Sequence, residues 1–294
     1  MKGNFKERED RKIVNNFKAW LLMGLLTVLL VLIGNLINGR SGAMLFFIIA
    51  LAMNFFSYFF SDRIAISMTR SKPLAEHEAP ELYDIIRNLT VRAGLPMPKV
   101  YLTPSAQPNA FATGRNPAHS AVAVTEGLMQ ILNRSEIEGV LAHELAHVKN
   151  RDVLIGTIAA TIAGAITMIA YMLQWGLIFG GGDEDNDNGF LGLAATLLMI
   201  ILAPIAATLI QLSISRTREF QADAAGARIA GQSGGLANAL LKLERASNRI
   251  PMQVNPAASH MFIVNPLSGA SFTRLFSTHP PIAERVRRLE ELKF

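Results

Sequence analysis

One short stretch carries residues that could hold a metal ion: His143, Glu144 and His147, which form the pattern H-E-x-x-H. On an α-helix the two histidines share one face, so both imidazoles can bind one metal ion. Glu144 lies on the neighbouring flank, where it can take a proton from a water that the metal activates without itself being a ligand. The stretch therefore predicts a zinc hydrolase, for which a third ligand must come from elsewhere.

The candidate third ligand is Glu219, because catalytic zinc sites have three protein ligands and one open position. Glu219 and Asp223 are four residues apart and would share a helix face. Glu219 would bind the metal, while Asp223 would accept the free N–H of a ligand histidine. We expect Arg216 beside these carboxylates. The alternative is a solvated acidic face paired with Arg216 and Arg218, but the upstream histidine pair favours the metal site.

The composition indicates a membrane protein. Of the 294 residues, 50% are hydrophobic and 17% are charged, whereas soluble domains carry roughly 25% charged residues. The net charge is +5, and the basic residues cluster, which suits contact with an anionic membrane surface. No element that could read nucleic acid accompanies them. The chain has no cysteine, which excludes disulfides, a zinc site built on cysteine and a cysteine nucleophile.

Four uncharged runs are long enough to cross a hydrocarbon core about 30 Å thick: 19–37, 43–60, 153–179 and 190–213. The first run is longer than the hydrophobic region of a signal peptide and lacks a cleavage site, so we interpret it as a membrane helix. The last two runs could instead form a buried core hairpin, but their length favours the membrane. The sequence therefore predicts four transmembrane helices.

The distribution of charge predicts how these helices are oriented. The N-terminal tail and the segments after the second and fourth runs are basic, whereas the loop between the third and fourth is purely acidic. By the positive-inside rule, both termini lie in the cytoplasm. The chain then divides into a tail with the first two helices (1–63), two parts of a cytoplasmic catalytic domain (64–152 and 214–294), and the second helix pair with its external acidic loop (153–213).

The first part of the cytoplasmic domain is predicted to be α+β. Helices are expected over 73–93, near 126–132, and from Ser135, where S-x-x-E forms a capping box. Three short runs of β type are separated by prolines, glycines and asparagine: 99–102, 110–113 and 121–124. The predicted fold class is thus a mainly α membrane protein with a zinc protease domain of α+β type, containing a small antiparallel sheet.

Several stretches carry a resemblance to a known family: QPNAFATG at 107–114, HELAH at 143–147, SRTREFQAD at 215–223, and THPP at 278–281 followed by Arg285. Together they resemble the HtpX family of membrane zinc metalloproteases, which are relatives of the CAAX prenyl proteases in the gluzincin group. The resemblance covers essentially the whole chain. It implies one zinc ion per chain, polypeptide substrates, a lipid bilayer as surroundings and no nucleic acid. It further implies degradation of misfolded or damaged membrane proteins during stress, at the bacterial cytoplasmic (inner) membrane.

The resemblance also implies roles that spacing alone does not assign. Asn109, Ala110 and Phe111 would form a strand at the edge of the cleft, to which an extended substrate adds through main-chain hydrogen bonds. An ordinary buried strand is the alternative for this segment. His279 would stabilise the oxyanion of the transition state.

His260 competes with His279 for the role of oxyanion donor, but the resemblance favours His279. Arg285 would pair with a buried carboxylate near the site; a surface arginine is the alternative. In the resulting mechanism Glu144 takes a proton from the attacking water and returns it to the leaving amine.

Two other classes of function fit parts of the sequence. One is a zinc-binding scaffold or inactive homologue, whose site usually loses its general base, and the full set of Glu144, Glu219 and Asp223 argues against it. A small-solute transporter would commonly carry ionisable residues inside its membrane helices, and none of the four apolar runs has one.

The ligand residues lie close in sequence to the apolar runs. Val153 follows His147 by six residues, and Glu219 follows Leu212 by seven. At a rise of 1.5 Å per residue, each path is ~10 Å if helical. We therefore expect the third and fourth membrane helices to extend directly from the two ligand-bearing helices, with zinc ~10 Å from the membrane face.

Overall fold

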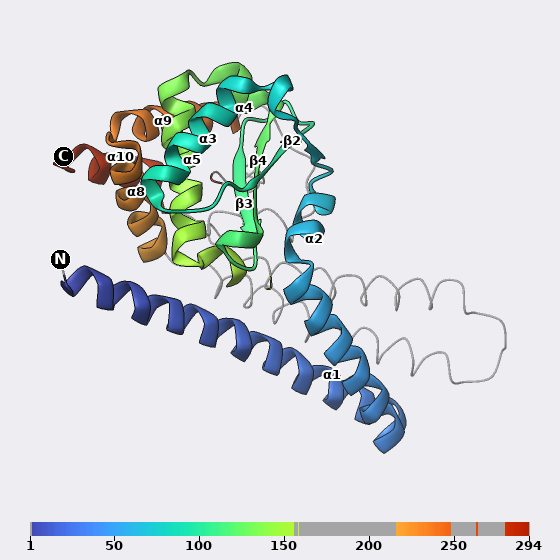
Figure 1. Cartoon of the computed structure of the whole chain (residues 1–294). Helices are drawn as coiled ribbons and strands as arrows, with labels where there is room; N and C mark the ends of the chain where they lie inside the picture. Colours follow the sequence, from blue (N-terminus) through green and yellow to red (C-terminus); the bar gives the residue numbers. More distant parts are fainter. Residues whose placement is uncertain (1, 156–157, 159–215, 248–262, 264–279, 294) are drawn as a thin grey trace.

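A long helical hairpin forms the N-terminal part of the chain (Figure 1). The computed structural model describes residues 2–155, 158, 216–247, 263 and 280–293. Helix α1 spans Lys2–Phe59 and bends at Asn38 and Gly39, whose backbone angles are not helical. Gly39 has a φ of +51°, a conformation that glycine adopts at little steric cost. The bend falls at the turn predicted between the first two apolar runs.

The second arm of this hairpin, Asn38–Phe59, is the one helix among the described residues that is long and apolar enough to cross a membrane, and the shorter apolar helix Ala19–Asn35 precedes it. Large apolar side chains such as Trp20 and Phe55 are exposed on the arms, which suits contact with lipid. The predicted runs 153–179 and 190–213, and the acidic loop between them, fall almost entirely outside the described residues. Four transmembrane helices therefore remain a prediction.

A small sheet forms one layer of the body beside the hairpin. Its strands are β1 (Lys72–Pro73), β2 (Lys99–Thr103), β3 (Ala110–Gly114) and β4 (Ser120–Thr125), in the order β1-β2-β4-β3. The sheet is mixed, because β2 and β4 run parallel while the other neighbours are antiparallel. The predicted antiparallel sheet is wrong in this pairing. Strand β4, the second strand of the β3–β4 hairpin, lies beside β2 and runs parallel to it, while β3 lies at the edge.

Helices cover the two faces of this sheet unequally. Val122 and Val124 of β4 belong to the main core, which also includes helix α3 (Pro80–Ala93). Phe111 of β3 points to the opposite face, where it packs with Ile66 of α2 (Ser61–Met68). The alternation follows from the two-residue period of a strand. Helix α2 thus joins the end of the membrane hairpin to the sheet (Figure 1).

Helix α5 (Arg134–Asn150) carries the H-E-x-x-H residues through the centre of the body. Its N-cap is Asn133, whose side chain accepts a hydrogen bond from the Glu136 amide, while the Glu136 carboxylate accepts one from the Asn133 amide. The predicted capping box at Ser135 is therefore wrong by two residues. Asparagine caps helices as well as serine does, and the pattern N-x-x-E precedes S-x-x-E in the chain.

Helix α5 ends abruptly at Arg151. Its C-cap Arg151 has a left-handed conformation, with a φ of +60°, and residues 152–155 begin a new helical segment. The prediction that the third membrane helix extends directly from the histidine helix is therefore wrong, because the left-handed residue turns the chain. The prediction that the fourth membrane helix extends directly into the helix of Glu219 concerns residues 190–215, which lie outside the described residues.

Two later helices, α8 (Arg216–Ala230) and α9 (Gly234–Ser247), pack against α5, and α10 (Ile282–Glu290) packs on both of them. Helix α4 (Glu126–Ile131) lies at the end of β4. Helix α8 approaches α5 closely at Gly226, where a Cβ atom would collide with the backbone of His143. Glycine at this position therefore lets the two helices that carry the candidate metal ligands meet.

Candidate metal centre

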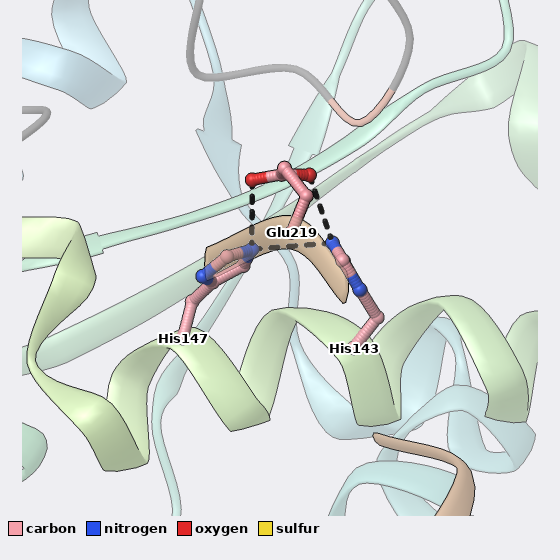
Figure 2. Close-up of side chains that lie close together, drawn as sticks. All are labelled: His143, His147 and Glu219. Carbon is pink, nitrogen blue, oxygen red and sulfur yellow. Dashed lines mark hydrogen bonds and ion pairs between the residues drawn. The ribbon is translucent and has the colours of Figure 1, made fainter. Parts of the chain in front are cut away.

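Three side chains from two helices converge on one point (Figure 2). His143 and His147 project from the same face of α5, and Glu219 reaches toward them from α8. The two histidine Nε2 atoms lie 3.2 Å apart. The Glu219 carboxylate oxygens lie 3.8 Å from Nε2 of His143 and 3.5 Å from Nε2 of His147.

These distances fit a tetrahedral metal site. Two ligand atoms that each lie 2.0–2.1 Å from zinc at tetrahedral angles are roughly 3.3 Å apart. The three measured separations, 3.2, 3.5 and 3.8 Å, lie close to that value. Two imidazoles and one carboxylate form a donor set typical of catalytic zinc, with one position left for water. The residues present therefore suit zinc.

The Nδ1 side of His143 contacts a buried ion pair between Asp223 and Arg285. Its Nδ1 lies 2.9 Å from the carboxylate of Asp223, and Arg285 donates two hydrogen bonds, of 2.8 and 2.7 Å, to the same carboxylate. Burial lowers the pKa of His143 to about 4, although Asp223 opposes that effect. The imidazole is therefore neutral at pH 7, the form that binds a metal. Burial also disfavours the charged form of Asp223, but Arg285 outweighs it and brings that pKa to about 2.

His147 has its own carboxylate partner, which the sequence reasoning missed. Its Nδ1 lies 3.2 Å from the carboxylate of Asp152. Burial disfavours the charged imidazole, but the hydrogen bond to Asp152 and the charge of Glu219 outweigh it and raise the pKa of His147 to about 9. An acidic residue five positions after the second histidine was the available signal. The turn that brings it back was not predicted.

The candidate general base, Glu144, lies between the metal ligands and the sheet. Its carboxylate accepts a 2.9 Å hydrogen bond from the amide of Ala112 in β3. Burial raises the pKa of Glu144 to about 7. A group with a pKa near neutrality can both take and return a proton at physiological pH. The contact with Ala112 also shows that β3 runs directly beside the metal site.

The predicted substrate strand is only partly arranged as expected. Strand β3 is an edge of the described sheet. The Ala112 amide and the Ala110 carbonyl point away from β4. The amide of Ile263 donates to the Asn109 side chain, at 3.1 Å, and to the Ala110 carbonyl, at 3.4 Å. Phe111 packs its side chain on the far face. The Asn109 side chain therefore binds the Ile263 amide, and the Phe111 side chain points away from the metal site.

The remaining predicted residues divide into three groups. Arg285 is fully buried against Asp223. Arg216 is exposed, so the structure does not bring it to the site. Arg218 lies on the opposite side of α8, is half-buried, and is close enough to Asp152 and Glu219 for their charges to act on it. His279 and His260 lie outside the described residues.

Such a centre beside the edge of a sheet places the chain among metallopeptidases that bind their metal through H-E-x-x-H and a downstream glutamate. The model of "Peptidase family M48" matches residues 76–293. The chain belongs to this family.

Relatives match along nearly the whole length. A protein described as "Protease HtpX homolog" from Pelotomaculum thermopropionicum is 68% identical over 279 residues, covering 95% of this chain and 99% of the relative. A protein with the same description from Pyrococcus furiosus is 55% identical over 276 residues, covering 94% and 95%. The family and these relatives identify the chain as a membrane metalloprotease.

One solved structure shows a likeness of fold. The crystal structure of S. mikatae Ste24p aligns with a TM-score of 0.50 and 22% sequence identity, covering 96% of this chain and 66% of that one. At that identity the comparison concerns the fold alone.

Proposed function

We propose that the chain is a zinc endopeptidase whose metal is held by His143, His147 and Glu219, with Glu144 as the general base. The observation that carries the proposal is the convergence of the three ligand atoms within 4.8 Å of one another. Zinc bound there would polarise a peptide carbonyl and lower the pKa of a bound water. One ion per chain satisfies the three ligands.

Protein groups around the metal would transfer the proton, orient a ligand and stabilise the oxyanion. Glu144 takes a proton from the attacking water and delivers it to the nitrogen of the cleaved bond. Asp223 fixes the orientation of His143 and is itself fixed by the bidentate contact with Arg285. His279 remains our proposal for the donor to the oxyanion, on the strength of the family resemblance.

The substrate would bind as an extended chain along β3. Peptides add to an exposed strand edge through main-chain hydrogen bonds, which demand few particular side chains. Ala112 faces the catalytic carboxylate, so the bond to be cleaved would lie near it. The main chain of Asn109 is paired with Thr125, and the Ala110 carbonyl accepts a hydrogen bond from Ile263, so the substrate would pair chiefly at Ala112. Such recognition suits an enzyme that cleaves many unrelated polypeptides.

The substrates would be membrane proteins, damaged or misfolded, that reach the site at the membrane surface. The segment that follows α5 supports this, because Leu154, Ile155 and Ile158 pack with Leu22 and Leu26 of the hairpin. The metal-bearing helix is thereby joined to the apolar N-terminal hairpin, whose second arm, Asn38–Phe59, is the candidate membrane span. We further propose the boundaries 1–63, 64–152, 153–213 and 214–294 given above, four transmembrane helices, cytoplasmic termini and active site, and the bacterial inner membrane as location.

Metal removal and restoration test this function. Full-length chain purified in detergent should cleave casein, lose that activity when a chelator removes the metal, and regain it with about one equivalent of zinc per chain. A scaffold or an inactive homologue would bind zinc without cleaving casein. Cleavage that survives complete removal of metal would overturn the proposal.

A further inference from the structure

The two histidine ligands are supported by different means. His143 has 1% of its side chain exposed and packs between α5 and α8, whereas the side chain of His147 is 14% exposed. Packing alone therefore restrains His147 less. Its Nδ1 lies 3.2 Å from the carboxylate of Asp152, which is itself only 10% exposed. The more open imidazole thus relies more heavily on a hydrogen-bond partner for its orientation.

The backbone after α5 is shaped so that this contact can form. On a continuous helix a residue five positions on would point roughly 140° away from His147. The chain avoids this because Arg151 adopts the left-handed conformation, with a φ of +60°. That conformation is unfavourable for a residue with a side chain, and glycine or asparagine is usual there. The turn at Arg151 brings Asp152 back to the imidazole.

The position of Asp152 does not favour the stability of α5. A negative charge at the C-terminal end of a helix is unfavourable, because the helix dipole is negative there. Asp152 is also the first residue of the helical segment 152–155, where an acidic residue is favourable. A purely structural role as a helix-start residue is therefore the alternative that an experiment must separate.

We propose that Asp152 is a positioning residue for the metal: it accepts the Nδ1–H of His147 and holds Nε2 toward the ion. This inference rests on the proposed zinc site. The two ligand histidines would then have matching supports, Asp223 behind His143 and Asp152 behind His147. Carboxylates behind ligand histidines fix the tautomer and strengthen metal binding. Because Asp152 immediately precedes the segment that packs with α1, it also joins the second ligand to the membrane hairpin.

Zinc affinity of the full-length chain in detergent, measured by chelator competition at pH 9, tests this role. That pH keeps proton competition at the imidazole small. Asp152→Asn retains the ability to start a helix but lacks the carboxylate, and it should bind zinc about 10–100-fold more weakly. Asp84→Asn removes an exposed carboxylate that pairs with Arg87 and should leave the affinity unchanged. Replacement of zinc by cobalt should give an altered absorption spectrum in Asp152→Asn only.

A purely structural role would have a different signature. If Asp152→Asn lowered the thermal stability of the zinc-free chain while zinc affinity and the cobalt spectrum stayed as in the wild type, the proposal would be overturned. Unchanged values of all three would also overturn it. Failure of the wild-type chain to bind one zinc would instead contradict the proposed zinc site itself, so the two failures can be told apart.

Discussion

Arg285 donates two parallel hydrogen bonds, 2.8 and 2.7 Å long, to the carboxylate of Asp223, and its side chain is fully buried. Asp223 in turn contacts Nδ1 of His143. A residue near the C-terminus thereby supports a metal ligand 142 positions earlier in the chain. Helix α10 is therefore part of the architecture of the site, although it contributes no ligand.

Arg285→Met should destabilise the chain strongly. The substitution leaves Asp223 as a buried carboxylate without its counter-charge, and loss of one partner of a buried ion pair typically costs about 3–5 kcal/mol. Thermal unfolding in detergent measures the effect. Arg287→Met is the matched control on the same helix, since Arg287 is exposed and its ion pairs with Glu284 and Glu291 lie in solvent, where such pairs contribute little to stability. Equal effects of the two substitutions would contradict the assigned role.

Glu219→Gln should remove the metal. The amide keeps the shape of the side chain but lacks the charge that binds zinc, so the loss of affinity should exceed the 10–100-fold typical of groups behind the ligands. Metal analysis after dialysis against a weak chelator gives the zinc content, which should fall well below that of the wild type. Glu290→Gln, an exposed change on α10, should retain full zinc content. A stoichiometric zinc content in Glu219→Gln would exclude Glu219 as a ligand.

Zinc affinity should fall as the pH is lowered from 9 to 7. The pKa of His147 is raised to about 9, so below that pH zinc must displace a proton from the imidazole, which weakens binding about tenfold per pH unit. Competition with a chelator of known pH dependence measures the slope. In Asp152→Asn the steep region should begin at lower pH, because the hydrogen bond that raises this pKa has lost its charge. A steep region that begins at the same pH in the two proteins would contradict this explanation.

The cap of α5 offers a test of the fold. Asn133→Ala should destabilise the protein by about 1 kcal/mol, because the Glu136 amide loses the side-chain oxygen that accepts its hydrogen bond. Ser135→Ala should have a smaller effect, since Ser135 lies inside the helix, where its hydroxyl accepts an exposed hydrogen bond from Gln232. Thermal unfolding of both variants decides between the two capping residues. A larger effect at Ser135 would contradict the structure.

The sequence was most informative where function depends on spacing within one helix. The pairs His143 and His147, and Glu219 and Asp223, share helix faces because of the helical period alone. The pairing of the strands was not predictable in the same way, because strand periodicity says which residues alternate but not which strand lies beside β2. The pairing of Arg285 with a buried carboxylate was predicted from family resemblance and not from spacing, and the structure identifies that carboxylate as Asp223.

Two local features explain the other differences between the sequence predictions and the structure. The support of His147 by Asp152 depends on a left-handed residue, Arg151, at a position where glycine or asparagine is the usual signal. Arg216 and Arg218 are two residues apart on one helix, and only packing decides which of them faces the site. The structure turns Arg218 inward and leaves Arg216 exposed.

The most direct test of the whole account measures zinc content and casein cleavage together in Glu144→Gln. The substitution removes the group that moves the proton while His143, His147 and Glu219 remain in place, so zinc should stay at one per chain and cleavage should disappear. Glu138→Gln on the same helix, where Glu138 pairs with Arg92 on the surface, should retain both zinc and cleavage. Sustained cleavage by zinc-loaded Glu144→Gln would contradict the account.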